Sequence, residues 1–175
     1  MKTEITLCFD FGNSRKKLAV FSNKKIIAER ILYTDTSGEI ETLLHEFKPQ
    51  KSILSSVINH NPGIEDTLKE KTHFHKLSVA TKLNFTAPVG KPETIGADRL
   101  AIAAAAVHFF PKKNNLVIGL GSCITFNFIS QQHEFLGGAI SPGMQMRFKA
   151  MHEFTLNRLR YQDKPAKRGF TWNGQ

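Results

Sequence analysis

Five residues near the N-terminus have the types and spacing of a phosphate-binding turn: Asp10, Gly12, Asn13, Ser14 and Lys17. Gly12 lacks the Cβ that would keep a polyphosphate away from the N–H groups of the turn. Ser14 can donate to a phosphate oxygen, Lys17 can neutralise one, and Asp10 can hold Mg²⁺, usually through water. An ordinary hairpin whose Gly-Asn turn needs positive φ explains the same residues equally well.

A second polar group, Gly96-Ala97-Asp98-Arg99, opens an alanine-rich segment with the pattern of a helix. In the first turn of a helix the macrodipole favours the ionised form of Asp98, which keeps this carboxylate ready to accept a hydroxyl proton. The planar guanidinium of Arg99 suits a substrate carboxylate. The alternative is that Asp98 caps the helix and that Arg99 is a surface residue.

A third group, Gly121, Ser122 and Thr125, follows the apolar strand expected at 116–118. Its backbone N–H groups and hydroxyls can contact phosphate in the same way as the first turn.

A glycine-rich segment leads into a final helix. Ser141 is expected to cap this helix, with Pro142 at its first position. Apolar residues then recur every three to five positions and predict one buried helix face, formed by Met144, Phe148, Met151, Phe154 and Leu159.

The elements that position these groups alternate between strands and helices. Periodicity predicts a β-meander followed by helix–strand units. The expected strands are 5–9, 18–21, 24–32, 51–57 and 74–79, and the expected helices are 40–47, 63–69 and 97–109. Ser55 and Ser56 at the end of the fourth strand are expected to be buried with satisfied hydroxyls.

The three polar groups and the glycine-rich segment, in this order, resemble the type III pantothenate kinases, also called the Bvg accessory factor family. The resemblance extends from about residue 5 to about residue 159. It implies an α/β fold, namely the duplicated fold of the actin-like and sugar-kinase ATPases, with an incomplete second half. The expected domains are a first actin-like or ribonuclease H-like domain at 1–113 and a partial second domain with an irregular basic tail at 114–175.

The resemblance implies ATP-dependent phosphorylation of pantothenate to 4′-phosphopantothenate, the first step of coenzyme A biosynthesis. Asp98 would be the general base, while Arg99, Gly96 and Ala97 would bind pantothenate. The residues implied for ATP and its phosphates are Asp10, Gly12, Asn13, Ser14, Lys17, Gly121, Ser122 and Thr125. The implied cofactors are ATP, Mg²⁺ held through water at Asp10, and a monovalent cation (K⁺ or NH₄⁺), and the implied assembly is a homodimer.

This chain departs from the family pattern in its second phosphate segment. Gly119 and Asn127 stand where the family usually has carboxylates, which predicts a weakened monovalent cation site. The family is also longer. A non-catalytic truncated remnant or accessory binding protein is therefore the alternative function, and a kinase acting on another small hydroxyl compound is a third reading.

Charge, apolar runs and cysteine spacing indicate which kinds of partner and location to expect. The net charge of +9 is heaviest after residue 157, but this segment has no recognised nucleic-acid-binding pattern, so a solvated tail is expected and nucleic acid is not expected as a partner. No apolar run approaches the roughly 20 residues that span a bilayer. Cys8 and Cys123 have no metal-ligand spacing and predict reduced, buried thiols. Together these features predict a cytoplasmic protein.

Overall fold

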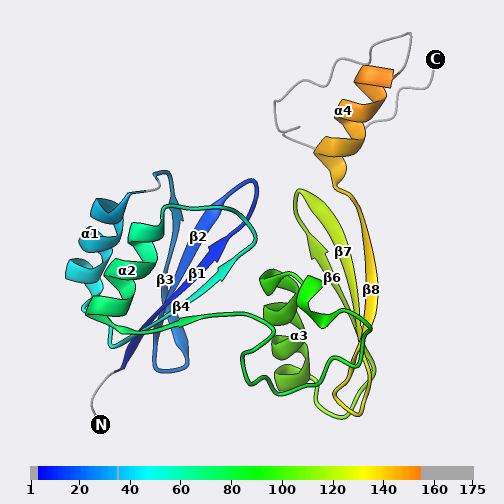
Figure 1. The fold of residues 1–175 in the computed structure, drawn as a ribbon, viewed down its shortest axis with the longest axis horizontal. Helices are drawn as coiled ribbons and strands as arrows, with labels where there is room; N and C mark the ends of the chain where they lie inside the picture. The colour runs from blue at the N-terminus through cyan, green and yellow to red at the C-terminus, as the bar shows by residue number, and fades with distance from the viewer. Residues whose placement is uncertain (1–3, 35, 155–175) are drawn as a thin grey trace.

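The computed structural model describes residues 4–34 and 36–154 as an α/β protein with two sheets (Figure 1). This confirms the predicted α/β class. The elements are β1 Ile5–Phe11, β2 Lys16–Ser22, β3 Lys25–Leu32, α1 Ser37–Phe47, β4 Lys51–Ser56, α2 Pro62–Lys71, β5 His73–Lys76, the 3₁₀ turn Pro92–Thr94, α3 Ala97–Phe109, β6 Asn115–Leu120, β7 Cys123–Ile129, β8 Phe135–Pro142 and α4 Met144–Phe154.

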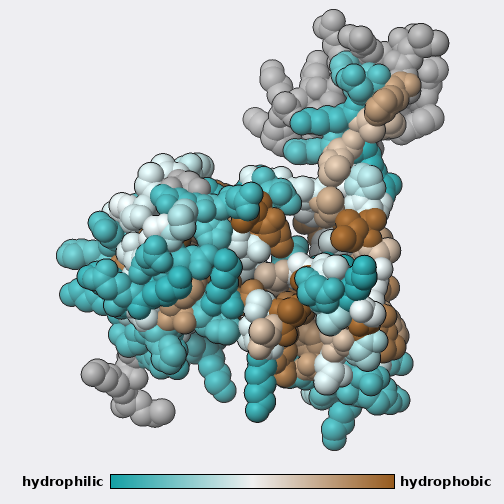
Figure 2. All heavy atoms as spheres, viewed as in Figure 1, coloured by the Kyte–Doolittle hydropathy of each residue, from teal (hydrophilic) through white to brown (hydrophobic). Residues whose placement is uncertain are grey.

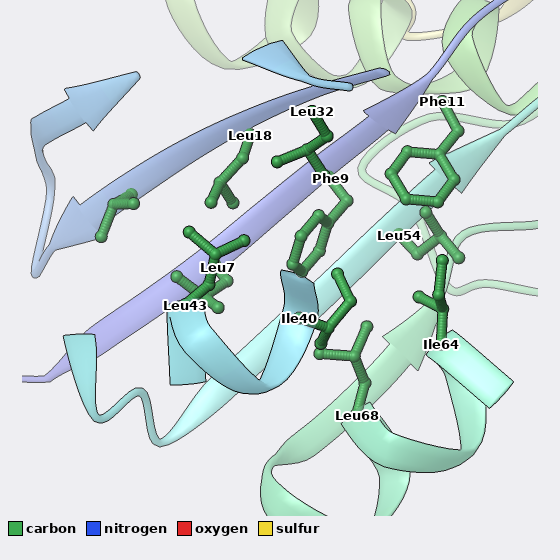
Figure 3. Close-up of a cluster of buried hydrophobic side chains, with 11 residues drawn as sticks. Leu7, Phe9, Phe11, Leu18, Leu32, Ile40, Leu43, Leu54, Ile64 and Leu68 are labelled. Atoms are coloured by element: carbon green, nitrogen blue, oxygen red, sulfur yellow. The ribbon is translucent and has the colours of Figure 1, made fainter. Parts of the chain in front are cut away.

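The first sheet has the strand order β3-β2-β1-β4-β5. β1, β2 and β3 form the predicted antiparallel meander, and β4 and β5 continue the sheet in parallel with β1. Alternate side chains of β1 (Leu7, Phe9 and Phe11) are buried, and they pack with Ile40 of α1 and Ile64 of α2 (Figure 3). The two helices therefore cover one face of this sheet and complete a core.

Both covering helices begin at a side-chain cap. Oγ1 of Thr36 accepts from the N–H of Glu39, so α1 begins three residues earlier than the apolar pattern alone predicts. Oδ1 of Asn61 accepts from the N–H of Gly63 at 2.9 Å, and Pro62 occupies the first helical position of α2, where its missing N–H costs nothing.

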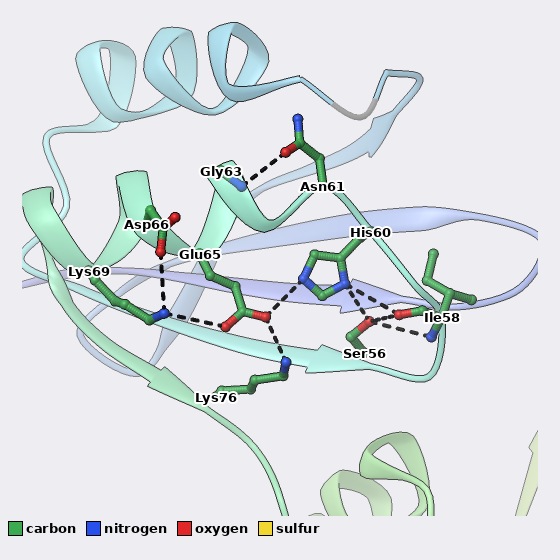
Figure 4. Close-up of polar contacts among 9 residues, drawn as sticks. All are labelled: Ser56, Ile58, His60, Asn61, Gly63, Glu65, Asp66, Lys69 and Lys76. Carbon is green, nitrogen blue, oxygen red and sulfur yellow. Dashed lines mark hydrogen bonds and ion pairs between the residues drawn. The ribbon is translucent and has the colours of Figure 1, made fainter.

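A polar network ties α2 to β4 and β5 (Figure 4). Nε2 of His60 lies 3.0 Å from Oε1 of Glu65, and Nδ1 of His60 lies 3.1 Å from Oγ of Ser56. Nζ of Lys76 donates to the same Glu65 oxygen at 2.6 Å. Burial favours the neutral acid of Glu65, but the hydrogen bonds and charges of Lys76 and His60 outweigh it and lower the pKa of Glu65.

The second sheet has the order β6-β7-β8, and both pairings are antiparallel. The helix α3 packs against it through buried residues such as Leu100, Ala103 and Val107, which share a core with Ile129 and Phe135. Although α3 precedes residue 113, it thus contributes to the second core. The domain boundary expected between 113 and 114 stays a prediction.

The other face of the second sheet is exposed among the described residues. Register pairs Leu116 with Phe128, Ile118 with Phe126 and Leu120 with Ile124 across β6 and β7. Leu120 is 81% exposed. In the space-filling view, hydrophobic residues gather over the part formed by α3 and the second sheet (Figure 2). The six residues paired above form what we call the open sheet face; four of them are exposed, and Ile124 and Phe126 are half-buried.

The approach to the last helix differs from the prediction. Ser141 and Pro142 belong to β8, where Pro142 pairs with Cys123, so they neither cap α4 nor begin it. Because β8 stays paired with β7 to its end, the helix begins only after Gly143. Proline can end an edge strand because no partner needs its N–H.

The apolar stripe of α4 is not a buried core face. The helix projects beyond the end of β8 (Figure 1), and Met144, Met151 and Phe154 are exposed. Leu159 and the basic tail lie outside the described residues.

Both cysteines are free and half-buried, and burial raises the pKa of the Cys8 thiol to about 11. Within residues 4–34 and 36–154, no helix is long and apolar enough to cross a bilayer.

Candidate active site

The first and third polar groups meet at the tips of two hairpins. The turn between β1 and β2 is closed by a hydrogen bond from the N–H of Gly12 to the main-chain oxygen of Arg15 at 3.1 Å. The hydroxyl of Ser14 in this turn is hydrogen-bonded to that of Ser122 in the turn between β6 and β7. Two segments 108 residues apart therefore bring their serine hydroxyls to one place.

The β1–β2 turn is not the positive-φ hairpin that was its alternative explanation. Among the described residues, the only glycine with positive φ is Gly137, and Asn13 is not among the non-glycine residues with positive φ. Asn13 is exposed in the turn. The two residues are thus not explained by the backbone of a tight Gly-Asn turn.

Asp10 lies at the end of β1, beside Lys17 of β2 and Ser55 of β4. Its Oδ2 is 3.8 Å from Nζ of Lys17. Burial raises the pKa of Asp10, Lys17 opposes this, and the negative charge of Asp98 raises the pKa further. The carboxylates of Asp10 and Asp98 therefore lie within electrostatic reach of each other although they come from different elements.

Ser55 differs from the prediction. The hydroxyl of Ser56 is satisfied as predicted, by Ile58 and His60, although Ser56 is only half-buried. Oγ of Ser55 is buried as predicted but has no hydrogen-bond partner among the described residues. Parallel register puts Ser55 next to Asp10 on the same face of the sheet. A buried hydroxyl without a partner costs free energy, so it is a candidate ligand contact that the sequence analysis set aside.

The N-terminus of α3 brings the second group to the end of β4. Gly96 is the N-cap, and Ala97 is the first helical residue. Oδ1 of Asp98 accepts from the N–H of Arg99 at 2.8 Å. A Cβ on Gly96 would lie 2.6 Å from Oδ1 of Asp98 and 3.5 Å from Cγ1 of Val57. Gly96 therefore lets the Asp98 carboxylate fold back over the helix end, and Asp98 is not the cap.

Arg99 is not the surface arginine of the alternative explanation. Its Nε donates to Oδ1 of Asn127 at 2.6 Å, and its Nη2 lies 3.4 Å from the main-chain oxygen of Phe126. The guanidinium carbon lies 5.4 Å from the centre of the Phe135 ring. The side chain is thus fixed between α3 and the second sheet.

Thr125 lies deeper in the second sheet than Ser122. Its Oγ1 accepts from Nδ2 of Asn127 at 3.3 Å. A Cβ on Gly119 would lie 2.7 Å from Oγ1 of Thr125, so the side chain of Thr125 occupies the space beside Gly119. The structure groups Thr125 with Asn127 and Arg99, and it groups Ser122 with Ser14.

Two cavities differ in their chemistry. One, of about 550 Å³, lies between α3 and β6 and is lined mainly by apolar side chains. The other, of about 530 Å³, lies on the face of β1, β2 and β3 away from the helices, and its charged lining is formed by Asp10, Arg15, Lys17, Glu29 and Arg30. With three cationic and two anionic side chains, the second cavity is the more polar of the two.

Mg²⁺ fits the donor set as a hydrated ion. Among the described residues, no cluster of three or more His, Cys, Asp or Glu side chains could hold a metal. Mg²⁺ keeps several waters and binds through one or two carboxylates together with substrate phosphates. Asp10 supplies one carboxylate, and Asp98, whose negative charge raises the pKa of Asp10, is a second carboxylate within electrostatic reach.

Comparisons with known proteins show what this chain is similar to. A sequence model of the family described as type III pantothenate kinase matches residues 6–169. A type III pantothenate kinase of Christiangramia forsetii is 40% identical over 164 residues, which cover 93% of this chain and 68% of the relative. That of Flavobacterium johnsoniae is 34% identical and covers 85% of this chain. This chain spans 62% of the length of the second relative.

A crystal structure described as a conserved Baf family transcriptional activator from Campylobacter jejuni is similar with a TM-score of 0.51 and 25% identity. The similarity covers 95% of this chain and 68% of that structure. Together with the family match over residues 6–169, it leads to one conclusion: the chain belongs to the type III pantothenate kinase family.

Proposed function

We propose that this chain catalyses the ATP-dependent phosphorylation of pantothenate to 4′-phosphopantothenate, the first step of coenzyme A biosynthesis. One observation carries the proposal: the Ser14–Ser122 contact joins two phosphate-type turns next to the Asp10 and Asp98 carboxylates. Phosphoryl transfer needs mainly positioning and neutralisation of the transferred oxygens, and this arrangement supports both.

In the proposed reaction, the hydroxyl oxygen of pantothenate attacks the γ-phosphorus of ATP. The new O–P bond forms as the bond from the γ-phosphorus to the β–γ bridging oxygen breaks, and ADP leaves with that electron pair. Asp98 accepts the hydroxyl proton as general base. Gly96 and Ala97 shape the substrate pocket at the start of α3, and Arg99 binds the pantothenate carboxylate.

The phosphates of ATP are assigned to the two turns. Gly12, Asn13, Ser14 and Lys17 contact them from the first sheet, with Asp10 beside them. From the second sheet, Gly121 and Ser122 contact them directly, and Thr125 supports that strand.

Bound Mg²⁺ would neutralise charge on the β- and γ-phosphates, and Asp10, with Asp98 nearby, would hold it through water. A monovalent cation (K⁺ or NH₄⁺) is proposed to act only weakly here. Gly119 supplies no side chain, and the oxygen of Asn127 is already bonded to the cationic Arg99.

The proposed assembly is a homodimer, in which the apolar side chains of α4 and the open sheet face offer surfaces for a second copy. Since the reaction consumes ATP, the proposed location is the cytoplasm.

A second candidate function is a non-catalytic remnant or accessory binding protein of the family. It is favoured by the uncharged residues at positions 119 and 127, which stand in place of two carboxylates of the second phosphate segment, and by the open sheet face, which offers apolar surface to a partner.

The test is mass-spectrometric detection of 4′-phosphopantothenate from purified chain, ATP, Mg²⁺, K⁺ and pantothenate. We expect product from the wild type and a rate lower by roughly 10²- to 10⁴-fold in Asp98→Asn, because the amide cannot accept the proton. No product from a folded wild-type sample would leave the binding function. A panel of other small hydroxyl compounds would test the third reading.

A further inference from the structure

Ser55 carries a buried hydroxyl to which the proposed reaction gives no role. The residue is 8% exposed, and its Oγ has no hydrogen-bond partner within residues 4–34 and 36–154. The hydroxyl of the next residue, Ser56, is bonded to His60 and Ile58. A buried hydroxyl without a partner costs free energy, so it indicates a contact that forms in another state of the site.

Register puts the Asp10 carboxylate beside this hydroxyl. Asp10 and Ser55 are direct neighbours across the parallel strands β1 and β4, so their side chains leave the same face of the sheet. Adjacent strands are about 4.8 Å apart, and rotation about the side-chain bonds can therefore bring Oγ of Ser55 to a carboxylate oxygen of Asp10. A bound ligand is the other kind of partner for this hydroxyl, but Oγ is closed to solvent, which favours the neighbouring protein group.

Lys17 lies on the opposite side of Asp10. It is the register partner of Asp10 on β2, and its Nζ is 3.8 Å from Oδ2 of Asp10. Both side chains of this long ion pair are about half exposed, so the pair holds the carboxylate only weakly. Burial raises the pKa of Asp10 and Lys17 opposes this, so the ionised carboxylate depends on a neighbouring cation or donor.

We propose that Ser55 is a positioning residue for Asp10: its hydroxyl donates to the Asp10 carboxylate when bound phosphate draws Lys17 away. The inference rests on the proposed function, in which Lys17 contacts the phosphates of ATP and Asp10 holds Mg²⁺ through water. When the ammonium group turns to a phosphate, a half-buried carboxylate loses its cation, and the neighbouring strand offers a hydroxyl donor in its place. The new hydrogen bond fixes the carboxylate on the face of the sheet that carries the phosphate-binding residues.

The second carboxylate of the site increases the need for such a donor. Val57, directly after β4, lies against the start of α3, because a Cβ on Gly96 would be 3.5 Å from its Cγ1. In the first turn of that helix, Asp98 carries a negative charge that raises the pKa of Asp10. A hydrogen bond donated to the charged form of Asp10 opposes this effect. Ser55 therefore lies on the segment that links the two carboxylates and can support one of them.

Urea unfolding of four proteins tests the proposal without any ligand: the wild type, Lys17→Ala, Ser55→Ala and the double variant. Lys17→Ala removes the cation as phosphate binding would, so the Ser55 hydroxyl should then bond to Asp10. In the wild type, Ser55→Ala should leave the unfolding midpoint unchanged or raise it, because it removes an unpaired buried hydroxyl. In the Lys17→Ala background the same substitution should lower the midpoint. Equal effects in both backgrounds would overturn the proposal.

Calorimetric titration with ATP, with and without Mg²⁺, tests the role of Ser55 in the site. We expect Ser55→Ala to weaken the binding of ATP with Mg²⁺ by roughly tenfold and to leave binding without Mg²⁺ unchanged, because the lost hydrogen bond is one that holds Asp10. Ser55→Thr keeps the donor and should restore the affinity. Ser56→Ala is the matched control: its hydroxyl is already bonded to His60, so the variant should lower the unfolding midpoint and leave both affinities unchanged.

Three results of the titration would contradict the proposal. The first is a Ser55→Ala variant with unchanged affinity for ATP in the presence of Mg²⁺. The second is an equal loss with and without Mg²⁺, which would indicate a merely structural role. The third is a Ser55→Thr variant that folds by circular dichroism but does not restore the affinity. If Ser55→Thr does not fold, Ser55→Ala decides.

The two experiments also separate this inference from the proposed function. If the wild type binds no ATP with or without Mg²⁺, the proposed function fails. The four unfolding measurements then still decide whether Ser55 holds Asp10 once Lys17 is gone, because they need no nucleotide.

Discussion

The two sheets of this protein begin in the same way but are covered differently. Each starts with a three-stranded antiparallel meander. In the first sheet, Leu7 and Phe9 of β1 are buried under α1 and α2 (Figure 3). In the second, Leu116 and Ile118 of β6 are exposed on the open sheet face among the described residues.

The two sheets therefore differ in how well their cores are covered, although both contribute to the candidate site. The first sheet has its own core and polar network, whereas within residues 4–34 and 36–154 the second sheet is covered on one face, by α3. Yet each sheet provides one of the two turns that meet at Ser14 and Ser122. The candidate site therefore depends on the first sheet, which is well covered, and on the second sheet, whose open sheet face offers apolar surface to another protein segment or a second copy.

Truncating apolar side chains tests the contrast most strongly. Leu7→Ala should lower the free energy of unfolding by about 2–5 kcal/mol, because Leu7 is fully buried. Leu116→Ala, matched in chemistry but 60% exposed, should cost less than about 1 kcal/mol. Urea unfolding of both variants measures the difference. Equal costs would mean that the open sheet face is covered in solution.

The second turn depends on a close backbone approach. Gly143 is buried, and a Cβ there would collide with the main-chain oxygens of Gly121 and Ser122. Gly143→Ala should therefore destabilise the protein by roughly 1–3 kcal/mol and weaken nucleotide binding. Gly90→Ala, where the added Cβ meets no atom within 4 Å, is the control. Thermal unfolding and ATP titration measure both effects. Equal stability and equal ATP affinity of the two variants would contradict the prediction.

The polar network of the first half predicts a pH dependence. The pKa of Glu65 is lowered in the folded state, so its contribution is present above the ordinary value of 4.5 and is lost as the pH falls through the lower folded value. Glu65→Gln should cost roughly 1 kcal/mol at pH 7 and reduce the acid sensitivity of unfolding. Chemical unfolding of the wild type and the variant between about pH 3 and about pH 7 measures this difference. An unchanged acid sensitivity in the variant would contradict the role of Glu65.

The smallest effect on stability is expected at the site itself. Lys17 and Asp10 are both about half exposed and 3.8 Å apart, so Lys17→Ala should change the free energy of unfolding by less than about 0.5 kcal/mol. The same variant should bind ATP more weakly, because a cation near the phosphates is lost. A Lys17→Ala variant with lower stability and unchanged ATP affinity would contradict the assignment of Lys17 to phosphate binding.

Much of the fold was predictable because local patterns and long-range packing agree. The apolar alternation of β1 and the spacing of Ile40, Leu43 and Leu44 in α1 match the core that forms. The stripe of α4 has the same kind of spacing but stays exposed in the described structure, since periodicity does not reveal whether a neighbouring element will cover it. Ser141 and Pro142 have residue types that suit a helix start, but pairing with β7 extends the strand through them.

The candidate site was predictable only in part. Residue types and order pointed to the two turns and to Asp98, but the contact between Arg99 and Asn127 joins residues 28 apart and depends on sheet register. The unpaired hydroxyl of Ser55 likewise becomes visible only when β1 and β4 are aligned. Asn127 attracted attention in the sequence as a missing carboxylate, whereas its bonding to Arg99 required the structure.

Hydrogen exchange of the purified chain with and without ATP and Mg²⁺ tests the central claim most directly, namely that the two turns form one phosphate site. The account predicts that residues 12–15 and 121–123 gain protection together, since Ser14 and Ser122 are in contact. Protection of one turn without the other, or of neither at saturating nucleotide, would contradict it.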